Sequence, residues 1–284
     1  SPACVFASNL AGSQSIDRYG SATLNISTFQ SVGGCYGCDS NLVTLRSPVR
    51  AYSPPTTDPF AALQNISQPT RSDLNCQDPP NVNGQTLTLS PSLPHTGTIP
   101  NRPIAYCSNN NNNNQVFNMN NGDTLYFQPG VYYFHNISFI VNGGTVSCPT
   151  CVAGQTGVTI IFTGEPDRIG TFSLNAQASF NLMASPNQRD SRYNGVLMYR
   201  DVRATQNDSN AYNTNINGGS TSRLSGGLYF PSSDMTYNGT ATLTSQSCTV
   251  LVARSVSFSG NVSNQGCAGF GASPTVTYAV RLVE

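Results

Sequence analysis

Hydrophobic residues along much of the chain recur at every second position, in short stretches that turn residues interrupt. In GGLYFPSSDMTYNG (226–239), Leu228 and Phe230 have this spacing. Met235 and Tyr237 repeat it after a polar interval. A helix would need apolar residues at spacings of three and four, whereas alternation is typical of a half-buried strand. The pattern therefore predicts short β-strands in this segment.

Similar stretches, bounded by turn residues, occur through the rest of the chain. They lie at 124–144, 157–164, 170–186, 194–201, 227–231, 249–263 and 276–284. No segment between them has the periodicity of a long amphipathic helix. The sequence therefore predicts an all-β protein.

Many short strands fit either a β-sandwich or a parallel β-solenoid. In stretches such as SVSFSGNVS (255–263), one to three small residues join the alternating segments. A tight hairpin usually needs Asn-Gly or Asp-Gly, whereas a solenoid corner needs only a small residue or Asn. We therefore predict a right-handed parallel β-helix, as a single domain over 1–284, with the sandwich as the alternative. The residues that turn a corner in 226–239 are Pro231, Ser232, Ser233 and Asp234.

The range 51–123 is rich in Pro and Asn and is predicted to be an irregular excursion from the solenoid. Its first part, 51–81, has one expected regular element, a short helical turn at 59–63. The run of asparagines at 109–114 is interpreted as a surface loop.

Composition restricts the partners that this chain can have. The 284 residues carry no formal net charge, and only 9% of them are charged. Nucleic-acid binding needs clustered Lys or Arg, so no nucleic acid is expected. No apolar stretch reaches the roughly 20 residues of a membrane span. The chain also lacks an initiator methionine and a signal peptide, so we expect it to be part of a longer protein.

Nine cysteines favour an oxidised, secreted protein. The alternative is a zinc site built from the two CxxC pairs, Cys35/Cys38 and Cys148/Cys151. The two histidines, His95 and His135, do not have ligand-like spacing to either pair. We therefore expect no metal and no cofactor.

Four disulfides are expected: Cys4–Cys35, Cys76–Cys107, Cys148–Cys151 and Cys248–Cys267. The last of these would link the final strands, and closing a loop of that size stabilises by about 3 kcal/mol. The ninth cysteine, Cys38 in this scheme, would pair with an upstream region, pair with a second molecule or stay free.

Carboxylates and tyrosines are the candidate functional residues. A glycoside hydrolase needs two facing carboxylates, but the only glutamates are Glu165 and Glu284. A lyase would use clustered aspartates and a basic residue; the one charge-dense stretch contains Asp190, Asp201, Asp208, Arg189, Arg192, Arg200 and Arg203. We interpret it as a ladder of arginine and aspartate that holds a loop to the solenoid, and we expect no catalytic residue.

For binding, exposed tyrosines would stack on sugar rings. Tyr193 and Tyr212 lie in polar surroundings, with Asp201 and Asp208 nearby in the sequence. These four residues form the candidate ligand-binding set, against the alternative of ordinary surface placement. The tyrosines in alternating strand contexts are expected to be packed: Tyr126, Tyr229 and Tyr237.

The C-terminal part of the chain carries a family resemblance. GGSTSRLSGGLYFPSSDMTYNG (218–239), CTVLVARSVSFSGNVSNQGC (248–267) and the final VRLVE (280–284) resemble the C-terminal region of TadG-type proteins of tight-adherence (Tad, or Flp) pilus systems. The likeness extends upstream through GVTIIFTG, NLMASPN and NGVLMYRD, so that it covers roughly 157–284. The inserts at 109–114 and 203–217 depart from the family pattern.

The resemblance implies an envelope-anchored extracellular domain with a β-helix stalk or head. Such proteins are associated with minor-pilin or adhesin roles in surface attachment. The implied partners are pilus or envelope components and surface glycans, with the membrane reached only through an N-terminal anchor upstream of this chain. Two other functions remain open, a carbohydrate-active β-helix enzyme and a structural subunit of a surface fibre.

Overall fold

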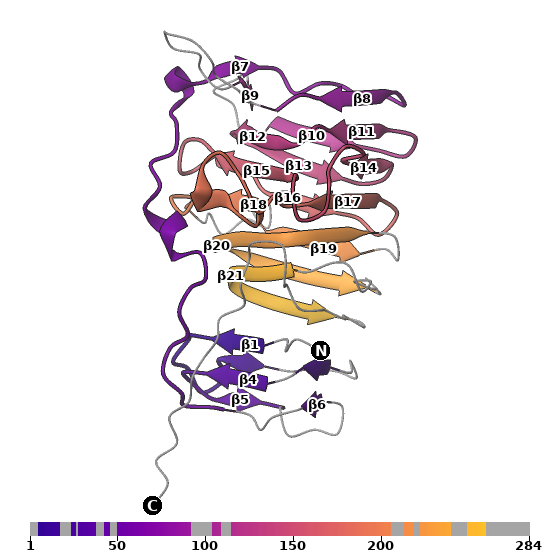
Figure 1. Cartoon of the computed structure of the whole chain (residues 1–284). Helices are drawn as coiled ribbons and strands as arrows, with labels where there is room; N and C mark the ends of the chain where they lie inside the picture. Colours follow the sequence, from indigo (N-terminus) through magenta and orange to yellow (C-terminus); the bar gives the residue numbers. More distant parts are fainter. Residues whose placement is uncertain are drawn as a thin grey trace, which may run out of the picture.

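The computed structural model describes residues 5–17, 24–26, 28–37, 43–45, 50–91, 104–108, 115–205, 213–218, 222–239 and 249–259 (Figure 1). This part of the chain is mostly β, with a few short 3-10 helices. A 15-stranded parallel sheet curls around the core, and two-stranded parallel sheets hold the N-terminal strands.

The large sheet consists of three rows of stacked strands. Row 1 contains β8 (Thr86–Leu89), β11 (Thr124–Phe127), β14 (Thr145–Ser147) and β17 (Ser179–Met183). Row 2 contains β7 (Asn75–Gln77), β9 (Ile104–Cys107), β12 (Gly130–His135), β15 (Val158–Thr163) and β18 (Val196–Arg200). Row 3 contains β10 (Gln115–Met119), β13 (Ile137–Val141), β16 (Phe172–Leu174) and β19 (Thr214–Gly218).

From β8 onward the chain visits rows 1, 2 and 3 in the same order, one circuit after another. Each strand pairs in parallel with its counterpart one circuit later, as β12 does with β15 and β15 with β18. All the strand pairings in the described ranges are parallel. An antiparallel sandwich does not contain such pairings, so the sandwich alternative is wrong.

The segment 226–239 forms part of one long strand that crosses all three rows. This strand, β20 (Arg223–Gly239), pairs with β17, then β18, then β19. The next strand, β21 (Thr249–Ser259), follows it in parallel, with a register shift between Phe230 and Asp234. The pairing partner of β20 changes across 231–234, where the corner was predicted, but the prediction of short separate strands is wrong here because β20 is continuous from Arg223 to Gly239.

Most strand predictions between 124 and 259 agree with the structure, because each predicted stretch contains or lies within a strand. The predictions missed β14 and β19, and 276–284 lies outside the described residues. The prediction for 51–123 is partly wrong, because β7 to β10 fall within this range and belong to the sheet. The helical turn expected at 59–63 is found two residues later as the 3-10 helix η1 (Ala61–Asn65).

Phenylalanine rings stack along the interior of the sheet. Parallel pairing in register places Phe117, Phe139 and Phe172 of row 3 one above another, with centroid distances of 5.2 and 5.9 Å between neighbours. Phe134 and Phe162 of row 2 are 5.7 Å apart, edge to face. These distances are typical of favourable aromatic pairs. The interior of each circuit therefore packs on equivalent side chains of the next.

The outer face of row 2 is covered by the segment 51–74, which we call the strap. Figure 1 shows it running along the outside of the stack, from the N-terminal strands to β7 at the opposite end. Its Phe60, Leu63 and Ile66 are buried in one cluster with outward-facing residues of row 2. Because both of its faces are covered, all five residues of β18 are buried. The strap also contains η2 (Arg71–Asp73), and η3 (Ser191–Tyr193) precedes β18.

The N-terminal strands repeat the three-strand arrangement. They are β1 (Val5–Ser8), β2 (Ile16–Asp17), β3 (Leu24–Ile26), β4 (Thr28–Ser31), β5 (Cys35–Tyr36) and β6 (Val43–Leu45). Each of the first three pairs in parallel with the strand three positions later. Figure 1 shows this group beyond β21, at the end of the molecule opposite β7.

The stacked rings predict a large cost for removing one of them. Phe139→Ala should lower the free energy of unfolding by about 3–5 kcal/mol, because it opens a cavity among several aromatic neighbours. The matched control is Val116→Ala on the adjacent strand β10, where the side chain is exposed, with an expected change within about 0.5 kcal/mol. Urea unfolding measures both values, and equal effects would contradict the described core.

Candidate binding surface

Tyr193, a candidate for stacking on sugars, is buried. It is only 2% exposed, and its ring meets Tyr199 edge to face at 5.7 Å. The side-chain amide Nε2 of Gln68, in the strap, donates a hydrogen bond of 2.8 Å to the Tyr193 hydroxyl. Burial raises the pKa of this phenol above its ordinary value. The prediction that Tyr193 offers its ring to a ligand is therefore wrong, because the strap covers this face.

Asp201 is also buried and is bonded to an arginine. Arg203 Nη2 lies 2.6 Å from Asp201 Oδ2, and the Thr163 hydroxyl donates to the same oxygen at 3.0 Å. Asp190 forms the equivalent pair with Arg192, at 2.6 Å, and this hydrogen bond lowers the pKa of the Asp190 carboxyl. Each aspartate thus holds the arginine two residues later. This agrees with the interpretation of a structural ladder, and Asp201 is not open to a ligand.

Arg200, at the end of β18, links the corner of the preceding circuit to the corner of the following one. Its guanidinium is fully buried and donates to the backbone oxygens of Ile169 and Gly170, at 3.0 and 2.9 Å. It also donates to the hydroxyl of Ser233 at 2.8 Å, in the corner 231–234. Buried arginine is tolerated when its donors are satisfied, so this residue holds together the corners on either side of its own circuit.

The other two candidate residues, Tyr212 and Asp208, lie outside the described residues, as does the Tyr237 side chain. Tyr229 is buried under the strap as expected, with its hydroxyl donating to Asp58 Oδ2 at 2.8 Å. Tyr126 is half-buried.

The exposed tyrosine rings of the described chain lie in the N-terminal part instead. Tyr52 is 78% exposed and Tyr36 is 54% exposed, with Leu10 nearby in the same circuits at 64%. Sequence reasoning missed these residues because Tyr52 falls in the range interpreted as irregular. The signal available was AYSPP (51–55), where a tyrosine lies at a turn directly before Ser-Pro-Pro.

Backbone hydrogen bonds place Leu10, Gly33 and Tyr52 in successive layers. The Gly33 amide donates to the Leu10 oxygen at 3.0 Å, and the Tyr52 amide donates to the Gly33 oxygen at 3.2 Å. A Cβ at Gly33 would lie 2.0 Å from the Gly12 oxygen, so this middle position must stay without a side chain. The result is a buried glycine, with no side chain, between two exposed side chains. We call Leu10, Gly33 and Tyr52 the N-terminal shelf.

The conformation of Tyr52 is costly for a bulky residue. Its φ is +57°, in the left-handed region that Gly or Asn adopts more readily. Non-glycine residues in this region are found preferentially at functional sites. The strained backbone and the exposed side chain therefore belong to the same residue, Tyr52.

The surroundings of the shelf are mostly polar, and the exposed Arg50, two residues before Tyr52, carries a charge. The segments 9–15, 33–37 and 51–57 contain no charged residue. The Asn9 side chain fixes the start of the strap, accepting from the Thr56 amide at 2.8 Å and donating to the Thr56 oxygen at 2.9 Å. An exposed ring with amides nearby can bind a neutral, hydroxyl-rich ligand by ring stacking and hydrogen bonds.

Two of the expected disulfides are confirmed. Cys76–Cys107 joins β7 to β9, and Cys148–Cys151 closes a turn between β14 and β15. Cys35 is also disulfide-bonded, whereas the other expected disulfide cysteines, Cys4, Cys248 and Cys267, lie outside the described residues together with Cys38. The zinc alternative is wrong for its two CxxC pairs, because Cys35, Cys148 and Cys151 have no free thiolate to offer. In the described ranges, no group of three His, Cys, Asp or Glu residues is placed to hold a metal ion.

Comparisons with family models, curated proteins and solved structures find no match for this chain. In the described part of the chain, no helix has both the length and the apolar character needed to cross a membrane.

Removing Arg200 should destabilise the stack. Arg200→Met eliminates the hydrogen bonds to Ile169, Gly170 and Ser233 and is expected to cost about 2–4 kcal/mol in unfolding free energy. Arg189 is exposed, so Arg189→Met should have almost no effect. Chemical denaturation of the two variants gives the comparison. A loss below about 1 kcal/mol for Arg200→Met would mean that the corner is held by other contacts.

Relieving the backbone at Tyr52 should stabilise the protein. Tyr52→Asn keeps a polar side chain that tolerates positive φ, and we expect a gain of about 0.5–1 kcal/mol. Tyr36, whose φ is not positive, provides the control, and Tyr36→Asn should give no such gain. Thermal unfolding distinguishes the two variants, and a loss of stability in Tyr52→Asn would show that the ring makes stabilising contacts.

Proposed function

We propose that the chain forms a right-handed parallel β-helix. The repeated order of rows 1, 2 and 3, with parallel pairing between circuits, supports this assignment. Crossover connections between parallel strands of one sheet are right-handed in nearly all proteins. Three strands per circuit then give a rod with three faces.

We further propose that this rod is a non-enzymatic, extracellular adhesin or minor-pilin domain of a Tad pilus system. The resemblance to TadG-type proteins supports the proposal. Much of the resembling sequence forms strands of the large sheet. GVTIIFTG contains β15, NGVLMYRD contains β18, and GGLYFPSSDMTYNG lies in β20. The disulfides are consistent with an oxidising compartment, extracellular or periplasmic.

The observation that carries the binding role is the exposed ring of Tyr52 on the N-terminal shelf. A hydrophobic ring kept in solvent at a backbone cost has no evident role in folding. The carboxylates that a β-helix enzyme would use are occupied, because Asp190 and Asp201 each form an ion pair with an arginine. This argues against catalysis by these two residues. Attachment through neutral surface glycans therefore fits this molecule better than turnover of a polysaccharide.

Substitutions at Tyr52 test this function on an array of neutral polysaccharides. Tyr52→Ala should weaken retention about tenfold or more, because it removes the aromatic anchor. Tyr52→Phe keeps the ring and should bind nearly as well as the natural protein. Val116→Ala, an exposed apolar residue on β10 outside the shelf, is the control for non-specific contact.

A parallel assay of reducing-end release, with and without calcium, tests the non-enzymatic part of the proposal. We expect retention without released ends. Sugar release that Asp201→Asn abolishes would overturn the proposal in favour of the enzyme, and equal retention by Tyr52→Ala and Tyr52→Phe would exclude the shelf as the contact.

A further inference from the structure

The two described disulfides have different surroundings. Cys107 is 0% exposed and lies in a small apolar cluster with Leu74 and Ala105, whereas its partner Cys76 is half-buried. Cys148 and Cys151 are half-buried, and the two residues between them, Pro149 and Thr150, are exposed. Attack on a disulfide requires a thiolate to reach one of the sulfur atoms. Both cysteines of the Cys148–Cys151 pair are partly exposed, against one of the Cys76–Cys107 pair, so access from solvent favours attack on Cys148–Cys151.

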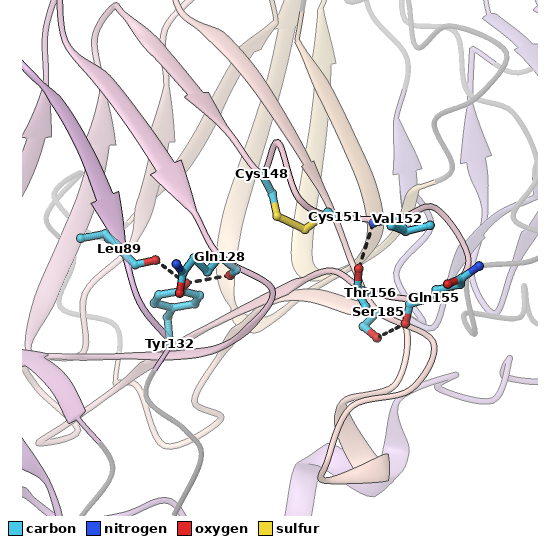
Figure 2. Close-up of a disulfide and its surroundings, with 9 residues drawn as sticks. All are labelled: Leu89, Gln128, Tyr132, Cys148, Cys151, Val152, Gln155, Thr156 and Ser185. Carbon is cyan, nitrogen blue, oxygen red and sulfur yellow. Dashed lines mark hydrogen bonds between the residues drawn. A yellow bond between two sulfur atoms is a disulfide. The ribbon is translucent and has the colours of Figure 1, made fainter.

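The loop that carries Cys148–Cys151 is also held by other contacts, which Figure 2 shows beside the disulfide. The Val152 amide donates to the Thr156 hydroxyl at 2.9 Å, and the Ser185 hydroxyl donates to the Gln155 oxygen at 3.1 Å. The strands before and after the loop, β14 and β15, are each paired on both sides. Breaking this S–S bond would therefore leave the circuits in place.

Reduction at this loop would also be reversible. The cysteines are three residues apart, and their Cα atoms are separated by 5.3 Å, within the range that a disulfide spans. With the loop held by Thr156 and Ser185, the two thiols would stay close enough to reoxidise. Cys76–Cys107 has the same Cα separation but joins residues 31 apart in the chain.

We propose that Cys148–Cys151 is a thiol–disulfide exchange site, whose partner is a protein dithiol of the oxidoreductase class. One thiolate of the partner attacks a sulfur of the pair and forms a mixed disulfide, and the other cysteine of this chain leaves as a thiolate. The second partner thiol then attacks the mixed disulfide. Two electrons and two protons pass to Cys148 and Cys151, and the partner is left with a disulfide. This site is independent of the proposed adhesion.

Graded reduction of the full chain tests the site. The chain is incubated with increasing dithiothreitol under native conditions, thiols are alkylated, and each cysteine is quantified by peptide mass spectrometry. We expect Cys148 and Cys151 to become alkylated about tenfold faster than Cys76 and Cys107, with the far-ultraviolet circular dichroism unchanged. Simultaneous reduction of both pairs, or reduction that occurs only on unfolding, would overturn the proposal.

Two paired variants act as controls in the same experiment. Cys148→Ser with Cys151→Ser should fold and lose the fast-reacting thiols, whereas Cys76→Ser with Cys107→Ser should keep them wherever it folds. A thioredoxin-type protein whose second active-site cysteine is replaced by serine traps the mixed disulfide. Trapping at Cys148 or Cys151 is the expected result, and equal trapping at Cys76 would contradict the assignment.

Discussion

Parallel backbone pairing between successive circuits is the constraint on which the rest of this structure depends. Each strand of a row finds its partner one circuit later and in register, so equivalent positions lie directly above one another. The phenylalanine stack of the core follows from this repetition. The corners follow too, because a residue such as Arg200 at the end of one strand lies beside the corner of the next circuit. A single buried guanidinium can therefore join three backbone segments.

The same repetition determines which surfaces are left for function. Stacking aligns outward-facing side chains of row 2 in a column that includes Tyr133, Tyr199 and Tyr229. Such a column would suit a ligand if it were exposed to solvent. The strap covers this column and converts it into a second core. An exposed ring in the described chain is found instead where the strap begins, at Tyr52. The tyrosine-bearing face of row 2 is thus structural, and the proposed binding shelf is small.

Local pattern predicted most of the strands but not which residues a distant segment covers. In 124–144, 170–186 and 226–239, the alternation of apolar and polar residues was enough to predict strands, because this pattern is contained within each strand's own sequence. Tyr193 was misjudged because its burial depends on Gln68 and the strap, 125 residues away in the chain. Strands β7 to β10 were missed because the range is rich in Pro and Asn, although Thr86–Leu89 (TLTL) does alternate. The Cys148–Cys151 pair was predictable because its geometry is local.

The central claim is that circuits stack in parallel and in register, and nuclear Overhauser effects between backbone protons of isotope-labelled protein test it most directly. β15 lies in the middle of row 2, so the account predicts contacts from Ile161 to Tyr133 on one side and to Tyr199 on the other, both in the parallel pattern. Antiparallel contacts from Ile161, or contacts to only one of these strands, would contradict the stacked arrangement and the surfaces derived from it.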